Sequence, residues 1–393
     1  MREVVILGAA RTIGGQFGGS FSGLTAPQLG AAVVRETINR SGITPDDIDQ
    51  TIFGNAWQAG VGPNAARLSS VMGGVNVSTP AVSVNVRCGS SVQALIFGAQ
   101  AIKAGDADTV LVGGTESTSM IPYGLPRARW GYRMGNSELV DLMHKDGFLC
   151  PLGGGFMGEI TDWLAKERGI SRHEQDLFAV ESHNKTEAAV RDGVFAEEVV
   201  PIPVKKKDQT VMVTEEEIYR KGVTVESLSV LKPVFSKDGT VTAGNACALC
   251  DAASAVVIME REKAKAMGLK PMALLRGYAF VGIDPRYFGL SPSKAIPVAL
   301  KNAGLALADI ELHELNEAFA AQYIACEQIL GLDRSRVNIY GGAIALGHPV
   351  AATGTKLLTT LLYALRRRDK TFGAVSACIG GGNGVAAIVE RLN

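Results

Sequence analysis

The chain has 393 residues and no formal net charge at pH 7, with 47% hydrophobic and 20% charged residues. That length allows two or three domains around a large buried core. The balanced charge, with basic runs no longer than three residues, argues against nucleic acid as a partner. No apolar run approaches the roughly 18 residues of a membrane span. Six scattered cysteines indicate a reduced, cytoplasmic protein without a disulfide framework.

Strand and helix patterns alternate over residues 1–114. The predicted strands are residues 4–7, 51–54, 81–86 and 109–114, and the predicted helices are residues 24–41 and 92–103. Gly42 ends the first helix. The fourth strand is apolar throughout, which is typical of a buried parallel strand. The alternation predicts an α/β unit.

Cys88 lies where the third of these strands turns into the next helix. The first N–H groups of a helix have no partner inside it, and that end of the helix is electrically positive. A thiolate is stabilised there, so we expect the pKa of Cys88 to fall below the free value of ~8.5. Gly89 leaves room for a substrate against the backbone. The stretch alone fits a nucleophilic cysteine and a buried structural cysteine equally well.

The alternation stops over residues 115–248. This region contains a glycine run at 153–155, a charged stretch at 205–221, and helical patterns at 158–168 and 172–192. Ser171 is suited to cap the second of these helices. We interpret the region as a large insertion over the α/β unit, where insertions commonly build a substrate site.

The α/β pattern returns with a strand at residues 252–259 and a further strand at 373–377. Residues 37–49 and 299–311 share the order helix, glycine, turn, acidic residue and strand. Residues 337–365 repeat the strand, glycine-rich turn and helix found around Cys88. An internal duplication of one α/β unit accounts for both similarities.

Three polar clusters fall on turns of this second half. Asn316 lies at a strand-to-helix junction, His348 precedes a proline on a glycine-rich turn, and Cys378 is followed by glycines from Gly380. The residue before a proline is held away from helical conformation, so the turn presents His348. The N–H groups of a glycine turn can bind an oxyanion. Singly, Asn316 would suit a helix cap, and His348 or Cys378 a place in the core. Together with Cys88 they suit acyl transfer from a cysteine.

The chain resembles the thiolases over essentially its whole length. The motifs that carry the resemblance are Arg11-Thr12, Cys88-Gly89-Ser90, Thr242-Ala243-Gly244-Asn245-Ala246, Asn316-Glu317-Ala318-Phe319-Ala320, the stretch 341–349 and Cys378-Ile379-Gly380-Gly381-Gly382. The resemblance implies the thiolase fold, in which two duplicated α/β halves form a five-layer α-β-α-β-α core with a large inserted loop domain. The implied halves are residues 1–118 with 249–271 and residues 272–393, and the implied loop domain over the CoA site is residues 119–248.

The resemblance also implies an acyl-CoA:acetyl-CoA C-acyltransferase, which cleaves a 3-ketoacyl-CoA with CoA or runs the reverse Claisen condensation. Cys88 would carry the acyl group and His348 would activate it. Cys378 would move a proton to and from the acetyl methyl carbon. Asn316 would hold a water that forms, with His348, an oxyanion hole for the enolate. The backbone N–H groups of Cys88 and Gly380 would form a second hole for the tetrahedral intermediate.

Coenzyme A would be a substrate, with no metal and no redox cofactor required. The implied CoA and acyl contacts are Arg220, Ser227, Leu231, Ala243, Cys247, Met157, Phe288, Ala318 and Phe319. The family further implies a cytoplasmic enzyme of fatty acid metabolism that forms a dimer or a homotetramer, with no nucleic acid or membrane partner. Residues 82–86 would pair with their copy across a two-fold axis, because an apolar edge strand would otherwise be exposed.

Some residues depart from the family's usual pattern. Cys247 stands where a serine is usual near the pantetheine arm, and Arg87 where an apolar residue usually precedes the nucleophile. Phe288 stands where short-chain enzymes often have methionine. These departures leave open a longer or less common 3-ketoacyl-CoA. Cys247 and Cys250 also form a C-x-x-C pair, which we interpret as substitution in a family loop, because no second pair of metal ligands is visible.

Two distant alternatives involve other chemistry. A ketoacyl-synthase-like condensing enzyme shares the fold but normally has a second histidine where this chain has Cys378. A non-catalytic thiolase-like subunit would be expected to lose Cys88 or the Asn316 motif, and both are present.

Overall fold

The computed structural model describes residues 2–207 and 209–392, and a mixed sheet of ten strands runs through it. The C-terminal half of the sheet has the order β14 (Leu312–Leu315), β15 (Phe372–Ile379), β16 (Asn383–Arg391) and β13 (Ala273–Gly282). The N-terminal half continues with β1 (Val4–Arg11), β12 (Cys250–Glu260), β5 (Thr109–Glu116), β3 (Gln50–Gly54) and β4 (Ala81–Val84), and β2 (Gly15–Gln16) pairs with β12. The halves join through two residue pairs of β1 and β13, Val5 with Leu274 and Ile6 with Ala273.

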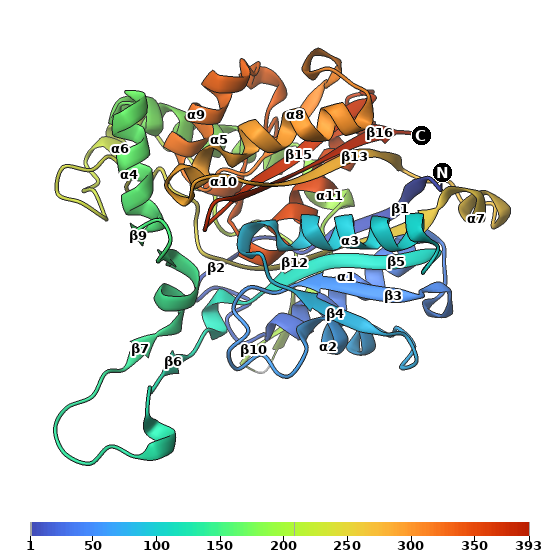
Figure 1. The fold of residues 1–393 in the computed structure, drawn as a ribbon, viewed down its shortest axis with the longest axis horizontal. Helices are drawn as coiled ribbons and strands as arrows, with labels where there is room; N and C mark the ends of the chain where they lie inside the picture. The colour runs from blue at the N-terminus through green and yellow to red at the C-terminus, as the bar shows by residue number, and fades with distance from the viewer. Residues whose placement is uncertain (1, 208, 393) are drawn as a thin grey trace.

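Helices cover both halves and separate them. Helices α1 (Ala26–Ser41) and α2 (Ala65–Met72) cover the outer face of the N-terminal half, and α8 (Ser291–Ala303) covers the outer face of the C-terminal half. Helices α3 (Ser90–Ala104) and α11 (Thr353–Arg367) lie between the halves and pack on strands of both. Figure 1 shows α3 between the two sets of strands and α8 on the far side of β13 and β15. The predicted five-layer core is therefore confirmed.

Most of the predicted elements are present, with shifted ends. Strand β1 continues beyond the predicted residue 7 to Arg11 and is buried along its whole length. Helix α1 begins at Ala26 because Thr25 forms a capping box with Gln28, and it ends where Gly42 takes a left-handed φ of 68°. Strand β5 is parallel to β3, as predicted, but antiparallel to β12 on its other side. The parallel prediction is thus right for one neighbour only.

The strand predicted near Val337 is wrong. The only ladder contact of Val337 among the described residues is an isolated bridge to His313. The next residue, Asn338, turns the chain with a φ of 46°. The Asn338 side-chain amide bonds both the N–H and the C=O of Leu315, at 2.9 Å each, and replaces the ladder bonds of a strand. The second half therefore lacks a full counterpart of β4.

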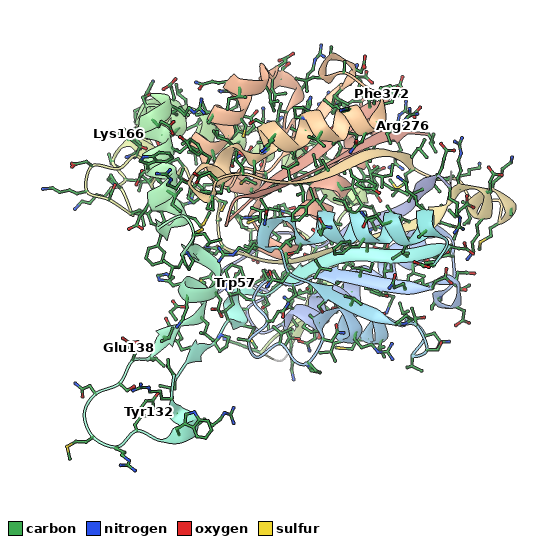
Figure 2. The ribbon with its side chains drawn as sticks, viewed as in Figure 1. Trp57, Tyr132, Glu138, Lys166, Arg276 and Phe372 are labelled. Carbon is green, nitrogen blue, oxygen red and sulfur yellow. The ribbon has the colours of Figure 1, made fainter. Side chains whose placement is uncertain are left out.

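The inserted region contains the remaining elements of the chain's middle. Its helices are α4 (Met157–Arg168), α5 (Arg172–Arg191) and α6 (Val225–Ser229), and its strand pairs are β6 (Tyr123–Gly124) with β7 (Val140–Asp141), β8 (Leu149–Cys150) with β9 (Gly155–Phe156), and β10 (Ile202–Lys206) with β11 (Gln209–Val213). Ser171 caps α5 as predicted, accepting from the N–H of Glu174. The loop between β6 and β7 extends away from the rest of the molecule, and Figure 2 shows Tyr132 and Glu138 on it.

The remaining helices are α7 (Arg261–Ala266), α9 (Ala320–Leu330) and α10 (Ala343–Leu346). None of the helices in the described part of the chain combines the length and apolar character of a membrane span.

Candidate active site

Cys88 and His348 form a hydrogen-bonded pair at the centre of the site. Cys88 lies in a 3-10 turn, Arg87–Gly89, that leads directly into α3. His348 lies on the turn after α10, where its backbone N–H donates to the carbonyl of Ala248 at 3.0 Å. The Cys88 Sγ and His348 Nε2 atoms are 3.1 Å apart, although 260 residues separate them in the chain. This is the geometry of a nucleophile beside its base.

Thr353 fixes the orientation of the imidazole. The Thr353 Oγ1 and His348 Nδ1 atoms are 2.6 Å apart, and Thr353 begins α11. If Nδ1 carries the hydrogen and donates it to Thr353, Nε2 is free to accept the proton of Cys88. Sequence reasoning missed this role, although the five-residue spacing from His348 into a helix start was visible.

The prediction that the pKa of Cys88 falls below the free value is wrong. Burial raises the pKa of the Cys88 thiol to about 11, more than the charge of Arg87 and the N–H groups of Gly380 and Cys88 itself lower it. Burial, followed by the charge of Lys356, lowers the pKa of His348 to about 3. The resting pair is therefore a neutral thiol and a neutral imidazole. Cys88 becomes a thiolate only by passing its proton to His348.

Cys378 and Gly380 close the opposite side of the site. Cys378 is the buried, next-to-last residue of β15, and burial followed by the nearby Cys88 charge raises its thiol pKa well above the usual value. The backbone N–H groups of Gly380 and Cys88 lower the pKa of the Cys88 thiol, because they favour its charged form. Two N–H groups that converge on the nucleophile are suited to stabilise a developing oxyanion there.

Asn316 presents an unpaired amide inside the protein. It follows β14, and its N–H donates to the carbonyl of Ser376 on the neighbouring strand at 2.9 Å. The residue is fully buried, yet neither its Nδ2 nor its Oδ1 atom has a hydrogen-bond partner in the described part of the chain. A buried amide without partners is costly, so this side chain is suited to hold a water molecule.

A pocket of about 70 Å³ lies next to Cys88 and His348. Its polar lining includes Cys88, His348, Cys378, Gly380, Arg87, Asp146 and Cys247, and its apolar lining includes Met157, Phe288, Ala318, Phe319, Trp57, Phe148 and Val350. The structure thus brings together four of the five predicted catalytic residues and most of the predicted acyl contacts. Asn316 does not line this pocket directly and lies two residues before Ala318, which does.

Comparison with known proteins agrees with this geometry. Residues 4–262 match the family "Thiolase, N-terminal domain", and residues 269–391 match "Thiolase, C-terminal domain". The chain belongs to the thiolase family. It is 47% identical to an acetyl-CoA acetyltransferase of Cupriavidus necator and 46% identical to one of Pseudomonas aeruginosa, over the full length of each chain.

Solved thiolase structures have the same fold. An acetyl-CoA acetyltransferase of Bacillus anthracis superposes with a TM-score of 0.97 at 38% identity, over 100% of this chain and 99% of that one. One from Syntrophomonas wolfei superposes with a TM-score of 0.98 at 37% identity, over all of both chains. The predicted thiolase fold is therefore confirmed.

Adjoining pockets connect the surface of this thiolase to Cys88. A surface pocket of about 170 Å³ shares Ala246 with a second pocket of about 480 Å³. The second pocket shares Phe148, Met157, Cys247 and Phe319 with the pocket around Cys88. We call these three adjoining pockets the passage, and their arrangement suits a long, narrow substrate arm that must reach the half-buried Cys88.

The predicted CoA contacts are spread unevenly along the passage. Arg220 and Ala243 line the surface pocket. Leu231 packs next to Gly244, which also lines it. Ser227 lies on α6 and is exposed, and its hydroxyl donates to the carbonyl of Thr224 at 2.7 Å. Among the described pocket linings, neither Leu231 nor Ser227 contributes directly.

The C-x-x-C pair is split between two environments. Cys247 lies at the neck of the passage, whereas Cys250 is fully buried at the start of β12. Burial raises the pKa of Cys250 to about 12 and raises that of Cys247 further. The described residues contain no group of three or more His, Cys, Asp and Glu side chains that could hold a metal ion.

Glu116, a buried carboxylate behind the site, was also not predicted from the sequence. Glu116 ends β5 and accepts hydrogen bonds from the Asn55 side chain and from the N–H groups of Ala56, Trp57 and Ala351, at 2.9 to 3.2 Å. It therefore links the wall of the acyl pocket to the turn that carries His348. A glutamate ending an apolar strand was the only sequence signal.

Proposed function

We propose that this thiolase is an acetyl-CoA C-acyltransferase that interconverts a short 3-ketoacyl-CoA plus CoA with acetyl-CoA plus an acyl-CoA. One observation carries the proposal: a Cys88–His348 pair with an Sγ to Nε2 distance of 3.1 Å shares a small apolar pocket with Cys378. The relatives at 44 to 47% identity that are named acetyl-CoA acetyltransferase support it.

In the cleavage direction, Cys88 transfers its proton to His348 as its sulfur bonds the 3-keto carbon. The N–H groups of Cys88 and Gly380 are placed to stabilise the oxyanion. The bond between carbons 2 and 3 then breaks, and the acetyl-CoA enolate takes a proton from Cys378. His348 and the water held by Asn316 stabilise that enolate.

The second half-reaction restores every proton. The Cys378 thiolate accepts the proton of the CoA thiol, whose sulfur attacks the acyl group on Cys88. The Cys88 sulfur leaves and recovers its proton from His348. CoA enters as a substrate, and the proposed steps use protein groups and the water held by Asn316, with no metal or redox cofactor.

The two cysteines are suited to ionise in turn. A charge on Cys88 raises the pKa of Cys378, so both thiols cannot ionise together. Once Cys88 is acylated it carries no charge, and this obstacle to the Cys378 thiolate disappears. Because the two sulfurs are close together, acylation of Cys88 favours the later ionisation of Cys378.

The size of the acyl pocket favours a small acyl group. Trp57, Phe148 and Phe288 close a space of about 70 Å³ next to Cys88. A longer 3-ketoacyl-CoA, the alternative left open by the sequence, is not favoured by this enclosure or by the relatives' names.

The test is thiolysis of acetoacetyl-CoA by CoA, followed as loss of the enolate absorbance. We expect turnover by the wild type and none by Cys88→Ala. Mass spectrometry should detect an acetyl adduct on Cys88 after mixing with acetyl-CoA alone. A wild-type enzyme that neither turns over nor acquires the adduct contradicts the proposal.

We further propose that the protein is a cytoplasmic homotetramer, a dimer of dimers. Strand β4 is the last strand of the sheet, so its outer backbone edge is available to a second copy, and Val82 on it is 48% exposed. The loop between β6 and β7 exposes apolar side chains, including Trp130 at 85% and Met134 at 99%, which suits contact with a further pair. The six free thiols fit a reducing compartment.

Light scattering at micromolar concentration tests the assembly. We expect about four times the monomer mass of 41.3 kDa. Replacing Trp130 and Met134 by serine should leave a dimer, whereas the same change at the exposed Leu152 should leave the tetramer intact. A wild type that scatters as a monomer contradicts the proposal.

A further inference from the structure

Arg87, the residue before the nucleophile, combines an unusual backbone with an engaged side chain. Its φ is 52°, in the left-handed region that residues with a side chain rarely adopt. Such conformations persist where the surroundings enforce them. Its Nη1 atom donates to the carbonyl of Gly147 at 2.9 Å, and its Nη2 atom donates to the carbonyl of Leu149 at 3.1 Å.

These two carbonyls belong to the residues on either side of Phe148. The planar fork of a guanidinium fixes two acceptors in a set geometry, which a lysine or an aliphatic side chain does not. Arg87 therefore holds the backbone around Phe148 at two points. Phe148 lines the acyl pocket and packs edge-on against Trp57, with 5.6 Å between the ring centroids.

Trp57 supports the same segment from the other side. A Cβ atom at Gly147 would overlap the Trp57 indole, so the backbone at 147 lies directly on that ring. The Trp57 N–H donates to Glu116 at 3.2 Å, and its Nε1 atom donates to the carbonyl of Met143 at 3.4 Å. The segment that carries Phe148 thus contacts both Arg87 and Trp57. Figure 2 shows Trp57 where the inserted region meets the N-terminal half.

We propose that Arg87 sets the acyl-chain selectivity of the enzyme by holding Phe148 in place on the wall between the acyl pocket and the adjoining pocket of about 480 Å³. The inference rests on the proposed function and names its substrate class: 3-ketoacyl-CoA thioesters with a short acyl group. An apolar side chain at 87 would leave the carbonyls of Gly147 and Leu149 without these donors. The Phe148 segment could then move outward and admit longer chains.

Direct recognition of an acidic acyl group is the alternative role, because Arg87 also lines the acyl pocket and a guanidinium has five N–H donors. Both Nη atoms already donate to backbone carbonyls. The positive charge also lowers the pKa of Cys88, second to the opposing effect of burial. A variant at 87 can therefore slow acylation of Cys88 generally, and only a ratio between substrates reports on the acyl pocket.

The test compares kcat/KM for 3-ketoacyl-CoA thioesters with four-, six- and eight-carbon acyl groups. Arg87→Leu should raise the ratio of the eight-carbon to the four-carbon substrate by about 10-fold or more, because one methylene in an apolar pocket changes kcat/KM by roughly 10- to 200-fold. Phe148→Ala should raise it in the same direction without touching residue 87. Arg191→Leu, at an arginine whose side chain is 71% exposed, should leave the ratio unchanged.

The outcomes separate the inference from the proposed function. A wild type inactive on every substrate refutes the proposed function. An active wild type with the same ratio in Arg87→Leu and Phe148→Ala refutes the inference alone, as does an equal loss on all substrates in Arg87→Leu. A wild-type preference for an acyl group that ends in a carboxylate, abolished in Arg87→Leu, would also overturn it. If Arg87→Leu fails to fold, Arg87→Lys and Phe148→Ala carry the test.

Discussion

At the scale of the residue, Cys88 and Cys378 are two thiols with different tasks in one pocket. Cys88 has a base at 3.1 Å, whereas Cys378 lies in an apolar cluster with Met157 and Phe288. Only the sulfur beside the base can be deprotonated readily in the free enzyme. The identity of the nucleophile is thus set by its neighbour and not by any intrinsic acidity.

Replacing Cys378 by serine should separate the two half-reactions. Cys378→Ser retains Cys88 and His348, so acetyl-CoA should still acetylate Cys88. Turnover should fall by about 100- to 10,000-fold, the usual contribution of a general acid or base. Mass spectrometry of the acyl-enzyme and steady-state thiolysis measure the two effects. Wild-type turnover in this variant would show that Cys378 is a packing residue.

Replacing His348 by asparagine provides the contrast. His348→Asn removes the base at 3.1 Å from Cys88 and one donor of the enolate oxyanion hole together. Acetylation itself should therefore slow more than in Cys378→Ser, since a lost oxyanion donor alone costs about 100- to 1,000-fold. Stopped-flow acetylation of both variants gives the comparison. Equal acetylation rates would argue against His348 as the activator.

At the scale of the element, the site depends on how the ends of strands and turns are joined. Glu116 ends β5 and accepts from two N–H groups after β3 and from one in the turn after His348. Burial raises the pKa of Glu116 to about 8, although these N–H groups favour its charged form. A single side chain therefore connects segments that the sequence places far apart.

Glu116→Gln should weaken this connection. The NH2 group of the glutamine would replace a carboxylate oxygen that accepts hydrogen bonds. At least one buried N–H donor would then lose its acceptor, at a cost of about 1–3 kcal/mol. We expect a lower thermal midpoint and reduced kcat. Glu197→Gln, at a carboxylate 55% exposed beside Arg366, is the matched control and should change little. If the two variants behave alike, Glu116 does not position the site.

At the scale of the whole molecule, buried histidines make folding sensitive to acid. Burial lowers the pKa of His313 and His183 to about 4 and that of His348 to about 3. Above the ordinary value near 6.5, these groups are neutral in both folded and unfolded chains. Below it, the unfolded chain binds protons at these histidines that the folded chain does not bind, so their contribution to stability falls as the pH drops from about 6.5 towards 4.

Thermal unfolding between pH 7.5 and 4.5 checks this direction. The histidine contribution to the midpoint should fall with pH over that window, whereas the buried Glu116 carboxyl, with a pKa raised to about 8, contributes in the opposite direction. His313→Asn should reduce the steepness of the fall, because it removes one such group, whereas His173→Asn at an exposed position should not. Equal steepness in all three proteins would contradict the assignment to His313.

The sequence by itself determined the fold class and the residues of the catalytic chemistry. Alternating apolar runs specify strands and helices because burial of one face is a local requirement, and β1, α1, α3 and β15 all appear near their predicted ranges. The motifs around Cys88, His348 and Cys378 were recognisable because each is contiguous in the chain. The strand predicted near Val337 is the exception, because the side-chain amide of Asn338 replaces the backbone hydrogen bonds of a strand there.

Only the tertiary structure decided how those residues behave. The 3.1 Å approach of Cys88 to His348 spans 260 residues, and no local pattern encodes it. The pKa of Cys88 rises because desolvation depends on every chain segment around the sulfur, which outweighs the local helix start that sequence reasoning considered. The two hydrogen bonds from the Arg87 guanidinium to the carbonyls of Gly147 and Leu149 likewise exist only after the inserted region folds over the site. The pKa of a group and the size of a pocket depend on the residues that are close in space, and the order of residues in the sequence does not show which residues these are.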